Sequence, residues 1–116
     1  MIRWYEKLYM DKKVSKHPKR AMRRVEAKKL WKNYFALTLA GNPDNLFEII
    51  ETREMFFRHN RQRELYIFGL ASSKKNAIKI LRDIFEEASV REEFDPRAMF
   101  ERKNFHGRKE GKKKKR

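Results

Sequence analysis

The chain has 116 residues, of which 41% are charged, and its formal net charge is +15 at pH 7. It contains no cysteine, which excludes disulfides, cysteine-ligated zinc, iron–sulfur clusters and thiol catalysis. The length suits one domain with a tail, and no apolar run approaches the ~20 residues of a membrane-spanning helix. We therefore expect a soluble, cytoplasmic protein without a secretory signal.

The positive charge gathers at the two ends of the chain. Residues 1–32 contain twelve Lys and Arg against three acidic residues, and residues 101–116 contain nine against two. Residues 33–100 are close to neutral, with ten against eleven. A folded domain flanked by two cationic segments is typical of a protein that binds a polyanion.

The first segment, residues 1–32, is predicted to be helical and basic. Within residues 2–14, Ile2, Tyr5, Leu8 and Tyr9 follow helical spacing. Pro18 suits the first turn of a second helix over residues 18–30. The outward faces of this helix carry Lys19, Arg20, Arg23, Arg24, Lys28 and Lys29.

Three interpretations of this amphipathic basic helix stay open. Surplus lysines on a helix usually form a solvated face. A membrane-surface helix is disfavoured, because the apolar stripe is narrow and partly needed for packing. We favour the third interpretation, in which the basic side chains contact phosphates.

The core, residues 33–93, reads as β-α-β-α. Residues 34–40 and 65–71 have the composition of buried strands, and each precedes a turn and an apolar helical pattern. A shift of 31 residues aligns the two units without a gap. A right-handed crossover would make the two strands parallel. The predicted fold is therefore α+β, with basic N-terminal helices before a small, parallel sheet.

Two segments follow the core. Residues 94–106 are expected to form a short helical extension. Residues 107–116 cannot bury apolar surface, so we expect a disordered polycationic tail. Its cationic end would contact phosphates, act as a nuclear-import signal or merely aid solubility; it comprises Lys112, Lys113, Lys114, Lys115 and Arg116.

The turns after the two predicted strands form a candidate anion site. Parallel strands would place residues 41–45 and 72–76 at one edge of the sheet, with two helix N-termini side by side. Backbone N–H groups there favour anions, and the second turn adds two hydroxyls and two ammonium groups. The candidate phosphate-binding residues are Ser72, Ser73, Lys74 and Lys75. The alternative is ordinary helix capping with nothing bound.

Aromatic and histidine residues offer weaker candidates. Trp4 lies among cationic residues, and an exposed ring there would stack on unpaired bases, although aromatics at helical spacing are more often core. His17, His59 and His106 have no Ser or Asp grouping and no metal-ligand spacing, although His59 could serve a small ribonuclease-like site. We therefore expect neither an enzyme nor a metal or cofactor site.

The sequence also carries a resemblance. Residues 4–9 (Trp-Tyr-Glu-Lys-Leu-Tyr), residues 39–42 (Leu-Ala-Gly-Asn) before residues 46–47, and residues 70–71 before the last helix support it. With these motifs the chain resembles a group of small, uncharacterised bacterial proteins from anaerobic Gram-positive species. The resemblance covers residues 2–90 and implies a bacterial cytoplasmic setting, but no mechanism.

Our leading hypothesis is a non-enzymatic nucleic-acid-binding protein. RNA is slightly favoured over DNA, because no helix-turn-helix reader is evident and the charge is diffuse. The alternative is a protein-interaction or regulatory module, compatible with a homodimer, in which the basic ends are incidental. Phe56 and Phe57 cannot both point inward from one helix face, so either one of them marks its partner surface or the helix ends there.

Overall fold

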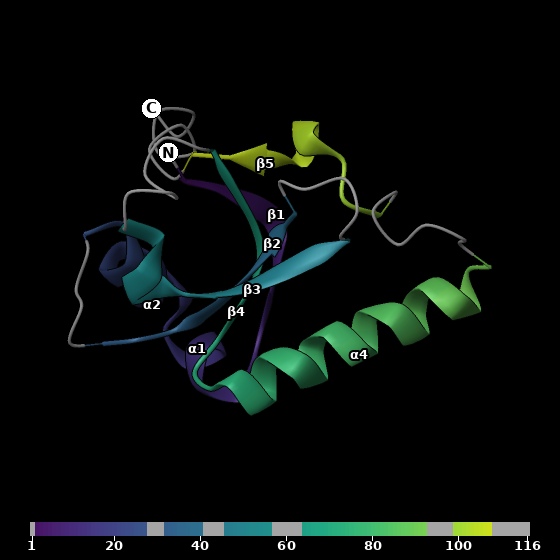
Figure 1. The fold of residues 1–116 in the computed structure, drawn as a ribbon, viewed down its shortest axis with the longest axis horizontal. Helices are drawn as coiled ribbons and strands as arrows, with labels where there is room; N and C mark the ends of the chain where they lie inside the picture. Colours follow the sequence, from purple (N-terminus) through teal and green to yellow (C-terminus); the bar gives the residue numbers. More distant parts are fainter. Residues whose placement is uncertain (1, 28–31, 41–45, 57–63, 93–98, 108–116) are drawn as a thin grey trace.

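A five-stranded mixed sheet forms the centre of the molecule (Figure 1). The computed structural model describes residues 2–27, 32–40, 46–56, 64–92 and 99–107. The strand order is β3-β2-β4-β1-β5, with β1 and β4 parallel and the other three pairs antiparallel. The strands are β1 (Ile2–Met10), β2 (Phe35–Leu39), β3 (Phe47–Glu51), β4 (Leu65–Ala71) and β5 (Phe105–His106).

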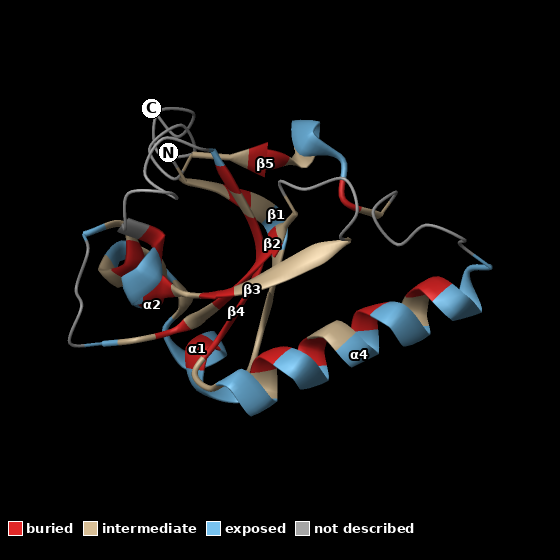
Figure 2. Ribbon diagram, viewed as in Figure 1, coloured by how far each residue is buried: buried red, intermediate tan, exposed pale blue. Residues whose placement is uncertain are grey.

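The described helices lie on both faces of this sheet. They are α1 (Lys12–Lys16), α2 (Pro18–Glu26) and α4 (Lys74–Val90), with short 3₁₀ turns η1 (Thr52–Phe56) and η3 (Arg102–Asn104). In β4, Leu65 and Ile67 pack in the cluster that includes α1 and α2, whereas Phe68 packs in the cluster that includes α4. Figure 2 shows β2 and β4 largely buried, β1 and β3 mostly of intermediate burial, and α4 exposed along its outer side. No helix in the described ranges is long and apolar enough to cross a membrane.

The prediction of a helix at residues 2–14 is wrong over its first nine residues, which form strand β1. Trp4, Leu8 and Met10 pack on the α1 and α2 side, and Tyr5 and Tyr9 pack on the α4 side. This is the two-residue period of a strand. Because β1 lies between β4 and β5 and carries large residues on both faces, the same apolar positions also matched a helical spacing.

The predicted parallel β-α-β-α core is also wrong. Residues 47–51 form strand β3 instead of a helix, and β3 pairs antiparallel with β2. Strands β2 and β4 are antiparallel, with Leu37 opposite Gly69. The parallel partner of β4 is β1, which had been assigned to a helix. The apolar residues of β3 therefore reflect a short strand with side chains in both core clusters, not a helix face.

Several other predicted elements are confirmed. Strands occupy residues 35–39 and 65–71, within or at the predicted bounds. Helix α2 begins at Pro18 and ends at Glu26, four residues before the predicted end. Helix α4 begins after Ser73, whose Oγ accepts a hydrogen bond from the Asn76 backbone N–H over 3.2 Å. Residues 108–116 of the predicted tail lie outside the described residues.

Candidate functional site

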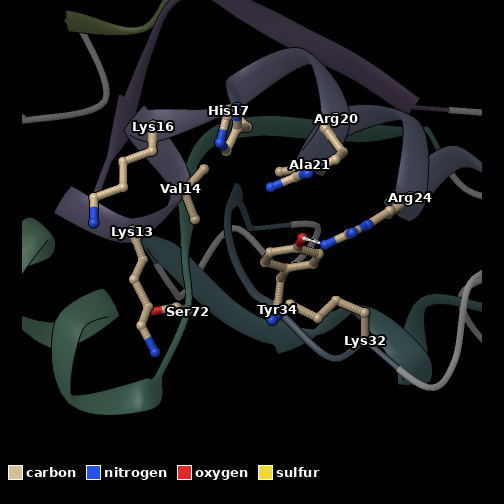
Figure 3. A pocket seen from close by; sticks show the side chains of 10 residues that line it. All are labelled: Lys13, Val14, Lys16, His17, Arg20, Ala21, Arg24, Lys32, Tyr34 and Ser72. Carbon is tan, nitrogen blue, oxygen red and sulfur yellow. Dashed lines mark hydrogen bonds between the residues drawn. The ribbon is translucent and has the colours of Figure 1, made fainter.

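A pocket of about 330 Å³ lies at the edge of the sheet where β1 and β4 end and β2 begins. In open α/β sheets, ligands bind outside the carboxyl ends of parallel strands, as β1 and β4 are here. Figure 3 shows the side chains around the pocket. They are Lys13, Val14, Lys16, His17, Arg20, Ala21, Arg24, Lys32, Tyr34 and Ser72.

Two consecutive helices build one wall of the pocket. Asp11 caps α1 by accepting a hydrogen bond from the Val14 backbone N–H over 2.9 Å. His17 then ends α1 and begins α2, with Pro18 at the first helical position. A five-residue helix followed directly by a second one makes a sharp corner, and the basic residues of that corner border the pocket.

The orientation of α2 follows from its buried residues. Ala21 and Val25 are buried, four residues apart, and pack against the sheet. Arg20 and Arg24 precede them by one residue each, so they share one side of α2 and line the pocket together. Apolar burial of α2 therefore fixes where these two guanidinium groups lie.

Among the described residues that line the pocket, five are cationic, Lys13, Lys16, Arg20, Arg24 and Lys32, and none is acidic. The Asp11 carboxylate lies next to this lining, hydrogen-bonded to Ser72. Among the described residues, none forms an ion pair with Lys13, Lys16 or Arg20. Like charges around a concave surface reinforce one another's potential. The pocket is therefore an attractive position for an anion.

Tyr34 supplies the buried base of the pocket. Its side chain is 4% exposed, and its hydroxyl oxygen accepts a hydrogen bond from Arg24 Nη1 over 3.3 Å. Its backbone N–H donates to Thr52 Oγ1 over 2.9 Å, and its carbonyl accepts from the Thr52 N–H over 2.8 Å. Lys32 Nζ lies 5.9 Å from the ring centre. Among the described residues no acceptor for the Tyr34 hydroxyl hydrogen is present, and a hydroxyl can donate one hydrogen bond while it accepts another.

The predicted anion site at residues 72–75 contains an anion from the protein itself. Asp11 Oδ2 accepts hydrogen bonds from the Ser72 N–H (2.8 Å), the Ser72 hydroxyl (2.5 Å) and Asn76 Nδ2 (2.9 Å). Burial raises the pKa of the Asp11 carboxyl, but these hydrogen bonds and the one from Val14 outweigh burial and lower it below its usual range.

The hydrogen bonds to Asp11 leave the predicted anion site with few free donors. Ser73 caps α4, so both serine side chains serve internal contacts, and Lys74 and Lys75 are exposed on α4. The end of β2 at Leu39 lies at the opposite edge from the end of β4, because the two strands are antiparallel. The described ends of β2 and β4 are therefore not side by side, the turn at residues 41–45 lies outside the described residues, and ordinary capping describes residues 72–75.

The predicted phosphate-contacting residues of the basic helix and the tail fall into three groups. Arg20 and Arg24 line the pocket, whereas Lys19 and Arg23 are exposed on α2 outside its lining. The remaining members lie outside the described residues: Lys28, Lys29, Lys112, Lys113, Lys114, Lys115 and Arg116. Sequence reasoning missed the contributions of α1 and of the segment before β2, which are Lys13, Lys16, His17, Lys32 and Tyr34.

Trp4, the candidate for base stacking, is a core residue, as is more common for aromatics. Trp4 is 3% exposed in the core beneath α2, and its indole Nε1 donates to Glu26 Oε2 over 2.8 Å. Its ring is therefore not available for base stacking. Phe57, a candidate partner contact, and His59, the candidate catalytic histidine, lie outside the described residues.

The other two histidines lie apart. His17 is exposed at the pocket, and His106 Nε2 lies 3.5 Å from Glu6 Oε2 across the β1–β5 pair. No group of three His, Asp or Glu in the described ranges is arranged to hold a metal ion.

Comparison with known proteins gives no family. No protein-family model, curated protein or solved structure matches this chain. The function must therefore be argued from the geometry of the pocket.

Proposed function

We propose that this protein binds nucleic acid, single-stranded RNA in preference to duplex DNA, and contacts phosphate groups through the cationic pocket. The observation that carries the proposal is the convergence of five Lys and Arg side chains on one pocket, whose described lining residues include no carboxylate. These side chains come from three separate segments, which are α1, α2 and the segment before β2. Basic side chains that converge from separate segments form a more defined anion site than basic side chains spread over a solvated surface.

The chemistry of the lining suits phosphate. Arg20 and Arg24 offer planar forks of donors that match phosphate oxygens, and lysines add mobile point charges. The exposed Lys19 and Arg23 extend positive charge along α2 beyond the pocket. Neutralised phosphates release counterions, so affinity would fall steeply with salt.

The shape of the region favours a single strand over a duplex. Helix α1 has five residues and α2 has nine, and α2 packs its apolar side on the sheet. This pair offers no long projecting helix of the kind that enters a major groove. A pocket of about 330 Å³ is at the small end of ligand sites and suits one nucleotide or phosphate group.

The test is fluorescence-anisotropy binding of a labelled single-stranded RNA and of a DNA duplex, titrated across salt. The test variant carries Lys16→Gln and Arg20→Gln in the pocket. The control variant carries Lys79→Gln and Arg82→Gln, which remove the same charge from the exposed side of α4. Both variants and the wild type are also examined as chains that end at Gly107, which removes the cationic tail.

The proposal expects the pocket variant to lose both affinity and salt dependence. Each lost phosphate contact on a single strand lowers the slope of log K against log salt by about 0.7, so two lost contacts lower it by about 1.4. The α4 control should keep a slope close to that of the wild type. Equal losses in both variants, or loss of all binding with the tail, would refute the pocket as the binding site and direct the search to protein partners.

A further inference from the structure

We infer, on the basis of the proposed function, that the pocket receives the phosphomonoester end of a nucleic-acid strand rather than an internal phosphodiester. The charge, the hydrogen-bond donors and the floor of the pocket indicate which part of the nucleic acid enters it. The chemistry is shared by 5′- and 3′-phosphorylated ends.

The charge of the pocket exceeds what one diester needs. An internal phosphodiester carries one negative charge, whereas a phosphate monoester carries about −1.5 to −2 at pH 7. Arg20 and Arg24 on the α2 wall of this pocket of about 330 Å³ match the larger and more concentrated charge. A monoester also presents three terminal oxygens as acceptors, where a diester presents two.

The donors of the pocket are arranged for several oxygens of one group. Arg20 and Arg24 lie four residues apart on α2, and Arg24 reaches the Tyr34 hydroxyl, so the guanidinium and the hydroxyl are neighbours (Figure 3). The Tyr34 hydroxyl can donate its hydrogen while it accepts from Arg24. Two arginines and one hydroxyl therefore provide donors to more than one oxygen of the same phosphate.

The floor of the pocket is closed by core residues. Val14, Ala21 and Tyr34 line it and are each at most 4% exposed, since they also belong to the core beneath α1 and α2. An RNA strand that runs across the protein surface would keep its diester phosphates above this closed floor, outside the pocket. The end of a strand can enter the pocket and stop there.

Lysines at the rim of the pocket contact the nucleotides next to the phosphorylated end. Lys13 and Lys16 on α1 and Lys32 before β2 are exposed and border the pocket, each on a long flexible side chain. They can follow the backbone as it leaves the pocket, without fixing its sequence. This division predicts strong dependence on the end group and weak dependence on base identity.

The test compares matched single-stranded RNAs that differ only in their end. Each RNA is labelled with fluorescein at one end and carries either a phosphate or a hydroxyl at the other, so that 5′ and 3′ ends are examined separately. The wild type, Arg20→Gln and the control Arg82→Gln are titrated with each RNA at constant salt. Circular dichroism spectra of all three proteins verify that they are folded.

We expect at least one phosphorylated end to bind about tenfold tighter than its hydroxyl counterpart. That advantage should disappear in Arg20→Gln and persist in Arg82→Gln. Equal binding of phosphorylated and hydroxyl ends, with Arg20→Gln weakening both, would overturn the end-recognition inference while the proposed function stands. Absence of binding to every RNA by the wild type would overturn both.

Discussion

Asp11→Ala should cost about 3 kcal/mol of unfolding free energy. The Asp11 carboxylate joins three segments, because it accepts hydrogen bonds from Val14, Ser72 and Asn76. The helix cap on α1 contributes about 1 kcal/mol, and hydrogen bonds to a charged group contribute about 1.5–3 kcal/mol each. The carboxylate is half-buried, so water replaces part of these bonds and the net loss falls near 3 kcal/mol. The melting temperature should drop by roughly 12 °C.

The matched control is Asp83→Ala, which removes the same charge from an exposed position on α4. Urea and thermal unfolding of both variants, followed by circular dichroism, measure the difference. We expect Asp83→Ala to lie within about 0.5 kcal/mol of the wild type, as is usual for surface substitutions. If Asp11→Ala were as stable as this control, the contact between the ends of β1 and β4 would not hold the pocket in place.

The stability difference between wild type and Asp11→Ala should also depend on pH. Hydrogen bonds hold the pKa of Asp11 below its usual range in the folded protein, despite the opposing effect of burial. The unfolded chain therefore binds the proton more readily, so the contribution of Asp11 is present above about pH 4 and is lost as the pH falls through the lowered folded pKa. Urea unfolding at a series of pH values should show the difference narrowing in acid; a constant difference would contradict this role.

Two further predictions concern the sheet and its α4 side. Gly69→Ala should lower the free energy of unfolding, measured in urea, by about 1–3 kcal/mol. The new Cβ would lie 2.8 Å from Leu37 Cδ1 and 3.3 Å from Leu37 Cβ, and Leu37 is fully buried. An unchanged urea midpoint would refute the close contact between β2 and β4. Burial, together with a 2.9 Å hydrogen bond to Glu87, raises the pKa of Tyr9 to about 12. Ultraviolet titration should therefore show a phenolate that forms near pH 12 and that Tyr9→Phe removes. The stability advantage of Tyr9 should be lost as pH rises from about 10 toward 12, the reverse of the acid case.

The parts of the fold that the sequence predicted well are those with strong local signals. Helix α4 has a serine cap and an apolar period, and α2 has Pro18 at its start. The sequence pattern does not indicate strand β1, because a strand with apolar side chains packed on both faces loses the simple alternation of apolar and polar residues. The pairing of β4 with β1 and β2 joins residues about thirty to sixty positions apart and leaves no local trace.

The pocket was predictable only in part for the same reason. Arg20 and Arg24 were predicted because they share one helix with other basic residues. Lys13 and Lys32 join them only after β1, β4 and β2 have brought α1 and the segment before β2 together. The acidic residue that occupies the predicted anion turn, Asp11, is likewise 61 positions from its partner Ser72. Charge composition therefore indicated the sign of the partner, and the sheet topology placed the site.

The most direct test of the central claim is to locate the bound RNA on the protein. Backbone amide shifts of the isotope-labelled full chain would be followed by NMR during titration with single-stranded RNA. We predict that the chemical-shift changes concentrate on α1, α2 and the segment that enters β2. These changes should all saturate at the same RNA concentration, while the amide shifts on the exposed side of α4 stay unchanged. Shifts spread evenly over all basic segments, or confined to residues 108–116, would contradict the cationic pocket as the nucleic-acid-binding site.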